Sequence, residues 1–77
     1  MLLKHKANVN LQAENGGTAL HAASFYGHIG VIEILLKNEA DINIETNDGL
    51  TSYDIASQAN HKEVAKIIMN HKNIKKN

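Results

Sequence analysis

The chain has 77 residues, with eight lysines, eight acidic residues and no formal net charge at pH 7. This length allows one small domain. The neutral balance argues against nucleic-acid or membrane-surface binding, which normally needs a basic excess. The absence of cysteine excludes disulfides and a thiol nucleophile, and it favours an intracellular, cytoplasmic setting. The apolar runs are too short for a membrane-spanning helix, which needs about 20 residues.

An internal repeat of 33 residues organises the chain. Shifting the sequence by this period pairs residues 1–44 with 34–77, and 12 of these 44 pairs are identical without a gap. The matching segments are 2–10 with 35–43, 15–24 with 48–57, and 28–34 with 61–67. Such a period is typical of proteins built from stacked repeats.

The first unit is expected to form two helices. Thr18 is a good N-cap because its hydroxyl can accept a free N–H of the first turn, so we expect a helix over 19–26. Gly27 ends this helix, and His28 starts a short turn. An apolar stripe at helical spacing then predicts a second helix over 29–38.

The second unit repeats this plan after a loop. Residues 40–49 alternate apolar and polar side chains and contain Asn-Asp-Gly, which predicts a hairpin-like loop. Thr51 then caps a helix over 52–59, and a second helix follows over 62–71. Asp54 lies three residues after Thr51, as in a capping box. His21 holds the corresponding position in the first unit, which indicates a structural role for this histidine.

Histidines and aromatic residues near one another could instead indicate a metal or ligand site. The five histidines are His5, His21, His28, His61 and His71. None are four residues apart, and the chain has no His-Glu-x-x-His motif. His28 and His61 are one period apart, as expected of a recurring turn residue. We therefore expect no metal site.

Catalytic motifs are equally lacking in the sequence. Ser24 and Ser57 recur at one register beside alanine, and we interpret them as small packing residues. No nucleophile elbow, paired carboxylates or phosphate-binding glycine loop is present. The Gly-rich stretch 15–17 is interpreted as a turn. We expect neither an enzyme active site nor a cofactor.

These blocks together closely resemble the ankyrin repeat, which has a 33-residue unit, a T-P-L-H-x-A core and a loop-plus-two-helix plan. The matching stretches are 16-GGTALHAA-23, 27-GHIGVIEILL-36 and 40-ADIN-43, then 49-GLTSYDIA-56 and 60-NHKEVAKII-68. The resemblance implies an all-α, ankyrin-type αα-solenoid of helix-turn-helix repeats joined by hairpin-like loops. It divides the chain into the end of a truncated repeat (1–10), a full repeat (11–43), and a second repeat with a basic tail (44–77).

The sequence departs from the family pattern in two ways. Ala19 and Ser52 stand where the family usually has proline. The glycine that normally ends the second helix is replaced by Lys6, Glu39 and Lys72 in the three registers. A left-handed backbone costs a non-glycine residue about 1 kcal/mol, so these helices either tolerate that strain or end differently.

The chain begins in mid-unit, so we expect it to be a piece of a longer array with adjacent repeats of the same chain as neighbours. Repeat proteins usually need about three units to be stable. We therefore expect marginal stability in isolation.

The resemblance implies a protein–protein interaction module whose partner, another protein, docks on the loop tips and the exposed side of the first helix of each unit. The positions concerned are Gln12, Glu14, Asn15, Gly17, Phe25, Tyr26, Glu45, Asn47, Asp48, Leu50, Gln58 and Ala59. Phe25 and Tyr26 do not recur one period later and are candidate anchors, because aromatic residues are favoured at interfaces. Alternatively, Phe25 leans on a neighbouring helix and Tyr26 is merely amphipathic.

The acidic loop tips favour a partner with some basic surface. Two other roles stay open. The repeats could be structural spacers in a larger protein whose activity lies elsewhere, or an accessory domain of an enzyme.

Overall fold

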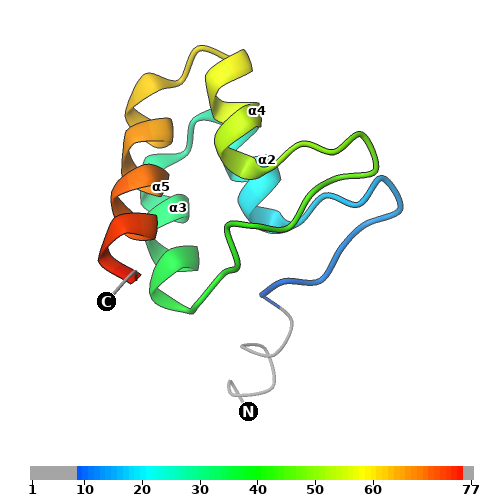
Figure 1. Cartoon of the computed structure of the whole chain (residues 1–77), viewed down its shortest axis with the longest axis horizontal. Coiled ribbons are helices and arrows are strands. Elements are labelled where there is room, and N and C mark those ends of the chain that lie inside the picture. The colour runs from blue at the N-terminus through cyan, green and yellow to red at the C-terminus, as the bar shows by residue number, and fades with distance from the viewer. Residues whose placement is uncertain (1–8, 76–77) are drawn as a thin grey trace.

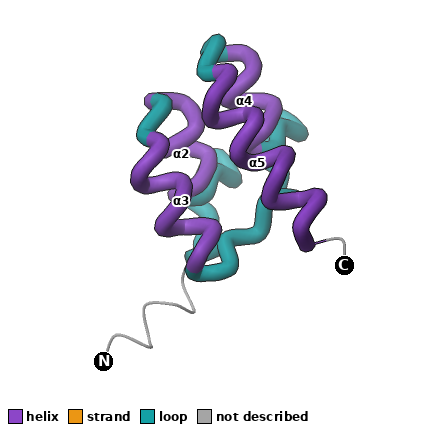
Figure 2. The backbone as a smooth tube through the Cα atoms, turned by 90° about the vertical axis from the view of Figure 1, so that its left-hand side faces the viewer, coloured by secondary structure: helices purple, strands orange, loops and turns teal. Residues whose placement is uncertain are grey.

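The computed structural model describes the backbone of residues 9–75 and the side chains of residues 9–71. The described helices are α2 (Ala19–Tyr26), α3 (Ile29–Lys37), α4 (Ser52–Gln58) and α5 (Lys62–Lys75). Each unit contributes one antiparallel helix pair, and the two pairs stack side by side (Figure 2). α2 and α4 form one layer, α3 and α5 form the other, and both loops project from the α2–α4 side (Figure 1). The predicted truncated repeat lies outside the described residues except for Val9 and Asn10.

We call α2 and α4 the inner helices, and α3 and α5 the outer helices. Capping boxes start both inner helices, as predicted. The Thr18 hydroxyl accepts from the His21 backbone N–H (3.4 Å), while the His21 ring accepts from the Thr18 N–H (3.0 Å). Thr51 and Asp54 form the same reciprocal pair, with 3.2 Å and 3.0 Å between the bonded atoms. Each pair satisfies N–H groups that the first turn of a helix leaves free. The sequence thus fixes where α2 and α4 begin.

Left-handed residues end the first three helices. Gly27, Glu39 and Asn60 have φ of 72°, 68° and 66°. After α3, the Ala40 N–H donates to the Leu35 carbonyl (3.0 Å), the bond that closes a Schellman motif. Of the two predicted alternatives at Glu39, the structure therefore shows a left-handed glutamate where the family usually has glycine.

α5 ends later than predicted. The prediction ended this helix at residue 71 and left open whether Lys72 would be left-handed, but α5 continues to Lys75. That prediction was wrong because the segment 70–75 contains no glycine or proline to stop a helix. Part of the predicted basic tail is therefore helical.

The core is one cluster shared by both units. Leu20, Ile32, Val64 and Ile68 are the large apolar side chains with at most 1% of their surface exposed. The small side chains Ala23 and Ala56 are also buried, which lets the helices approach closely. Both units contribute side chains to this cluster, so stacking of the units helps to remove its apolar surface from water.

The outward face of the second unit differs from the corresponding face of the first. Leu20 is 1% exposed, but its counterpart Tyr53 is 37% exposed. Leu36 is buried, whereas Met69, one period later, is exposed. The second unit covers this face in the first unit, so the two units are not interchangeable in the stack.

We predict that Glu39→Gly raises the free energy of unfolding by about 0.5–1 kcal/mol, because glycine adopts φ near 68° without the penalty that a Cβ atom brings. Urea denaturation monitored by circular dichroism would measure the change. Glu39→Ala is the matched control, since it removes the carboxylate near the C-terminal end of α3 but keeps the Cβ atom. An equal gain in both variants would contradict the backbone explanation and point to the helix dipole instead.

Candidate partner-binding groove

The His21 side chain connects the two units at the N-terminal ends of the inner helices. Its ring lies in α2 and is 4% exposed. Its Nε2 atom lies 3.0 Å from the Leu50 carbonyl oxygen in the following loop. A carbonyl can only accept, so Nε2 carries the proton and Nδ1 accepts from the Thr18 N–H. One tautomer therefore caps α2 and fixes the next loop.

The loop tips also bond directly to each other. The Asn47 backbone N–H donates to the Asn15 carbonyl, and the Asn47 side-chain amide donates to the Glu14 carbonyl, both at 2.9 Å. Within the first loop, the Gln12 amide donates to the Gly16 carbonyl (2.8 Å). A Cβ atom on Gly16 would lie 2.7 Å from the Asn47 backbone nitrogen. The loops are therefore held as a stacked pair, and glycine at position 16 allows their close approach.

A second histidine joins the units at the other end of the inner helices. The His61 Nε2 atom donates to the Phe25 carbonyl oxygen at 3.0 Å. The His61 ring lies against Gly27, where an added Cβ atom would come within 2.7 Å of the ring Nδ1. His28, the counterpart of His61, is exposed and stacks on Tyr26 with 5.9 Å between ring centroids. The His61 side chain thus bonds to the backbone of the first unit, as expected of a structural turn histidine, whereas the His28 ring stacks on Tyr26.

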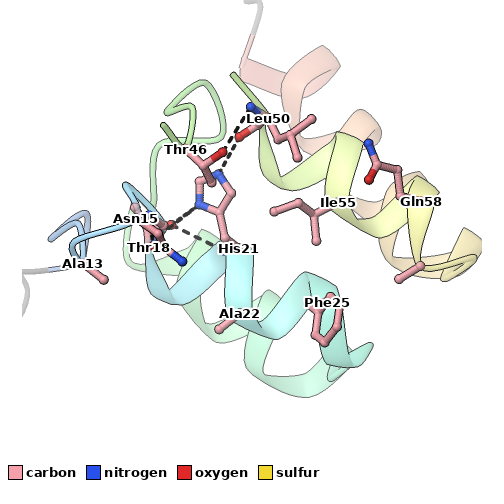
Figure 3. A pocket seen from close by; sticks show the side chains of 12 residues that line it. Ala13, Asn15, Thr18, His21, Ala22, Phe25, Thr46, Leu50, Ile55 and Gln58 are labelled. Atoms are coloured by element: carbon pink, nitrogen blue, oxygen red, sulfur yellow. Dashed lines mark hydrogen bonds between the residues drawn. The ribbon is translucent and has the colours of Figure 1, made fainter. Parts of the chain in front are cut away.

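Between these two joints lies an open groove of about 580 Å³. Its lining residues are Ala13, Asn15, Gly17, Thr18, His21, Ala22, Phe25, Thr46, Leu50, Ile55, Gln58 and Ala59. Figure 3 shows loop residues Ala13, Asn15 and Thr46 toward one end and Phe25 and Gln58 toward the other. The surface is mainly apolar, with a few polar groups at its edge, as in many binding sites.

Of the adjacent aromatic residues Phe25 and Tyr26, one lines this groove and the other does not. Phe25 lines it and is 56% exposed, while Tyr26 does not line it and is 65% exposed. Their rings meet edge to face with 5.0 Å between centroids, and Tyr26 continues to His28. Phe25 is therefore presented into the groove, and Tyr26 supports it from the end of α2.

Six of the predicted contact residues line the groove, namely Asn15, Gly17, Phe25, Leu50, Gln58 and Ala59. The predicted loop-tip residues that do not line the groove are Gln12, Glu14, Glu45, Asn47 and Asp48. Gln12 and Asn47 use their side-chain amides to hold the loops. Whether these positions contact a partner stays a prediction.

Ala22 and Ile55 also line this surface, although they are not among the predicted contact residues. The two residues are one period apart and follow the caps at the same offset, so they belong to the same side of α2 and α4. Three residues after each comes another groove residue, Phe25 or Gln58, at helical spacing. Combining the period with the helical repeat would have found them.

No group of three or more metal-ligating side chains gathers anywhere in residues 9–71. Over the same part of the chain, no helix has the length and apolar character needed to cross a bilayer.

Comparison with known proteins agrees with the geometry. The family model for ankyrin repeats, in three copies, matches residues 1–77. This chain belongs to the ankyrin repeat family. A comparison with curated proteins returned no match. Proteins of this family generally act as protein-interaction modules rather than enzymes, and the two described ankyrin units have the expected all-α helix-turn-helix fold.

We predict that His21→Ala lowers the free energy of unfolding by about 2 kcal/mol, because it leaves the Thr18 N–H and the Leu50 carbonyl without their partner. Urea denaturation would measure the loss. His28→Ala is the control, since this exposed histidine has only a stacking contact with Tyr26; we expect a change within about 0.5 kcal/mol. Equal effects of the two substitutions would contradict the bridging role of His21.

We also predict that Gly27→Ala destabilises the stack by more than the usual cost of about 1 kcal/mol for a left-handed alanine, because its Cβ atom meets the His61 ring. In a His61→Ala background the cost should fall toward that value. Gly49→Ala provides the comparison, since φ there is 80° and no described atom lies within 4 Å of the added Cβ. A Gly27→Ala cost that is the same with and without His61 would show that the contact is unimportant.

Proposed function

We propose that this ankyrin chain is a protein–protein interaction module that binds another protein through the α2–α4 groove and the adjoining loop tips. The observation that carries the proposal is Phe25, whose apolar ring is more than half exposed at the end of a preformed groove. A large aromatic side chain in such a place is a suitable anchor for a partner. Binding would involve non-covalent docking without turnover.

The bonds around the groove support this proposal. His21 fixes Leu50, and His61 fixes the last turn of α2 from which Phe25 projects. A surface that is rigid before binding loses little conformational freedom when a partner docks. By contrast, a structural spacer would have no need for an exposed aromatic ring at this point.

The test compares the partners captured by the intact chain and by two variants. We expect Phe25→Ala to reduce capture of specific partners about tenfold, the effect of a loss of about 1.4 kcal/mol in binding. Quantitative mass spectrometry of affinity-captured proteins would measure this change. Circular dichroism should show unchanged helicity, because Phe25 contributes little to the core.

Ile34→Ala is the matched control for this experiment. Ile34 is 60% exposed on α3, which is in the outer layer and away from the groove. Its substitution should leave capture unchanged. If all three proteins capture the same set at the same levels, the groove is not a binding surface and the spacer role is favoured.

A further inference from the structure

The neutral net charge of the chain conceals a separation of charge between its two sides. The loops and inner helices, residues 9–28 and 40–61, contain no lysine or arginine. They contain five acidic residues, which are Glu14, Asp41, Glu45, Asp48 and Asp54. The lysines whose side chains the structure describes, Lys37, Lys62 and Lys66, all lie on the outer helices α3 and α5.

Three of the acidic residues border one end of the groove. Glu14 lies between the lining residues Ala13 and Asn15, and Glu45 precedes the lining residue Thr46. Asp48 lies at the tip of the same loop. All three side chains are exposed. In the described residues their carboxylates form no hydrogen bond, while the Glu14 and Glu45 carbonyls hold the loops together. The carboxylates are therefore available to a partner.

The opposite end of the groove is mainly apolar, with Gln58 as a polar lining residue. Phe25 stands there beside Ala22, with Ile55 and Ala59 across from it on the α4 side. Figure 3 shows Phe25 and the loop residues toward opposite ends of the same surface. The groove thus offers an apolar contact at one end and negative charge at the other.

From this combination we infer that the groove binds a basic peptide segment of another protein, with one apolar side chain seated against Phe25 and lysines or arginines at the acidic loop tips. This inference rests on the proposed function and narrows the partner to a chemical class. Exposed charges of opposite sign steer association and fix the direction of the bound segment.

The length of α2 sets the spacing within such a segment. Phe25 is seven residues after Thr18 (25 − 18), which corresponds to about 10 Å along a helix at about 1.5 Å per residue. An extended peptide covers that distance in about three residues. The loop tips reach beyond Thr18, so the apolar residue and the nearest basic residue should be separated by about three to five positions.

Selection of random peptides displayed on phage would test both the groove and its charge preference. The immobilised baits are the intact chain, the Phe25→Ala variant, and a neutralised triple variant with Glu14→Gln, Glu45→Gln and Asp48→Asn. The matched control triple carries Glu33→Gln, Glu39→Gln and Glu63→Gln. These control residues are exposed on or beside the outer helices, so both triples change the net charge equally.

We expect enriched peptides that need Phe25, carry net positive charge and bind the neutralised triple about tenfold more weakly than the control triple at low salt. This difference should shrink at high salt, because ions screen exposed charges. Phe25-dependent peptides without a basic bias, or with equal affinity for both triples, would overturn the charge inference and leave the proposed function standing. If no enriched peptide depends on Phe25, the proposed function fails together with the inference.

Discussion

The hydrogen bond from the His21 ring to the Leu50 carbonyl is the interaction on which the arrangement of the two units depends. The same ring accepts from the Thr18 N–H, so a single side chain completes a local cap and a contact 29 residues away in sequence. His21 is buried, and removing its ring would leave both polar partners without the hydrogen bond that they make to it, which is costly. The start of α2 and the position of the next loop are therefore coupled.

The bridge from His21 to the following loop has no equivalent at the corresponding residue of the second unit. Asp54 occupies the corresponding place in the second unit and caps α4 through the same reciprocal bonds with Thr51. A carboxylate accepts hydrogen bonds but has no N–H to donate to a following carbonyl, so Asp54 reproduces the cap without the bridge. Gly27 and Asn60 are one period apart, and both are left-handed. The His61 ring lies where a Cβ atom on Gly27 would be, so that position needs glycine, whereas Asn60 carries a Cβ atom. The two units therefore share the same order of helices and turns but differ in the residues available to contact a following unit.

The consequence for function is a rigid surface made from short elements. The stacked loops and the two histidine bonds hold α2 and α4 at both ends, while the apolar residues between them remain open. The side chains that connect the two units at both ends of the groove are largely polar and have hydrogen-bond partners. Phe25 is the large apolar side chain that α2 presents at this surface. The charges differ between the two sides as well: the loop side carries carboxylates without lysines, whereas the outer helices carry both lysines and glutamates. The framework and the proposed recognition surface therefore share Thr18, His21 and Leu50, while the Phe25 ring belongs to the recognition surface.

The sequence by itself determined the period, which is read from residues 33 positions apart. It also determined the starts of all four described helices and the two capping boxes, because these depend on residues within a few positions of one another. It also identified Glu39 as an unusual helix-ending residue, although the choice between strain and another ending needed the backbone. Only the tertiary structure separated Phe25 from Tyr26, since adjacent helical residues point about 100° apart and the neighbouring unit decides which direction faces the groove. It likewise showed that the amides of Gln12 and Asn47 bond within the loop pair and that His61 binds the Phe25 carbonyl. These contacts join atoms brought together by stacking, and a local pattern carries no information about the partner that stacking supplies.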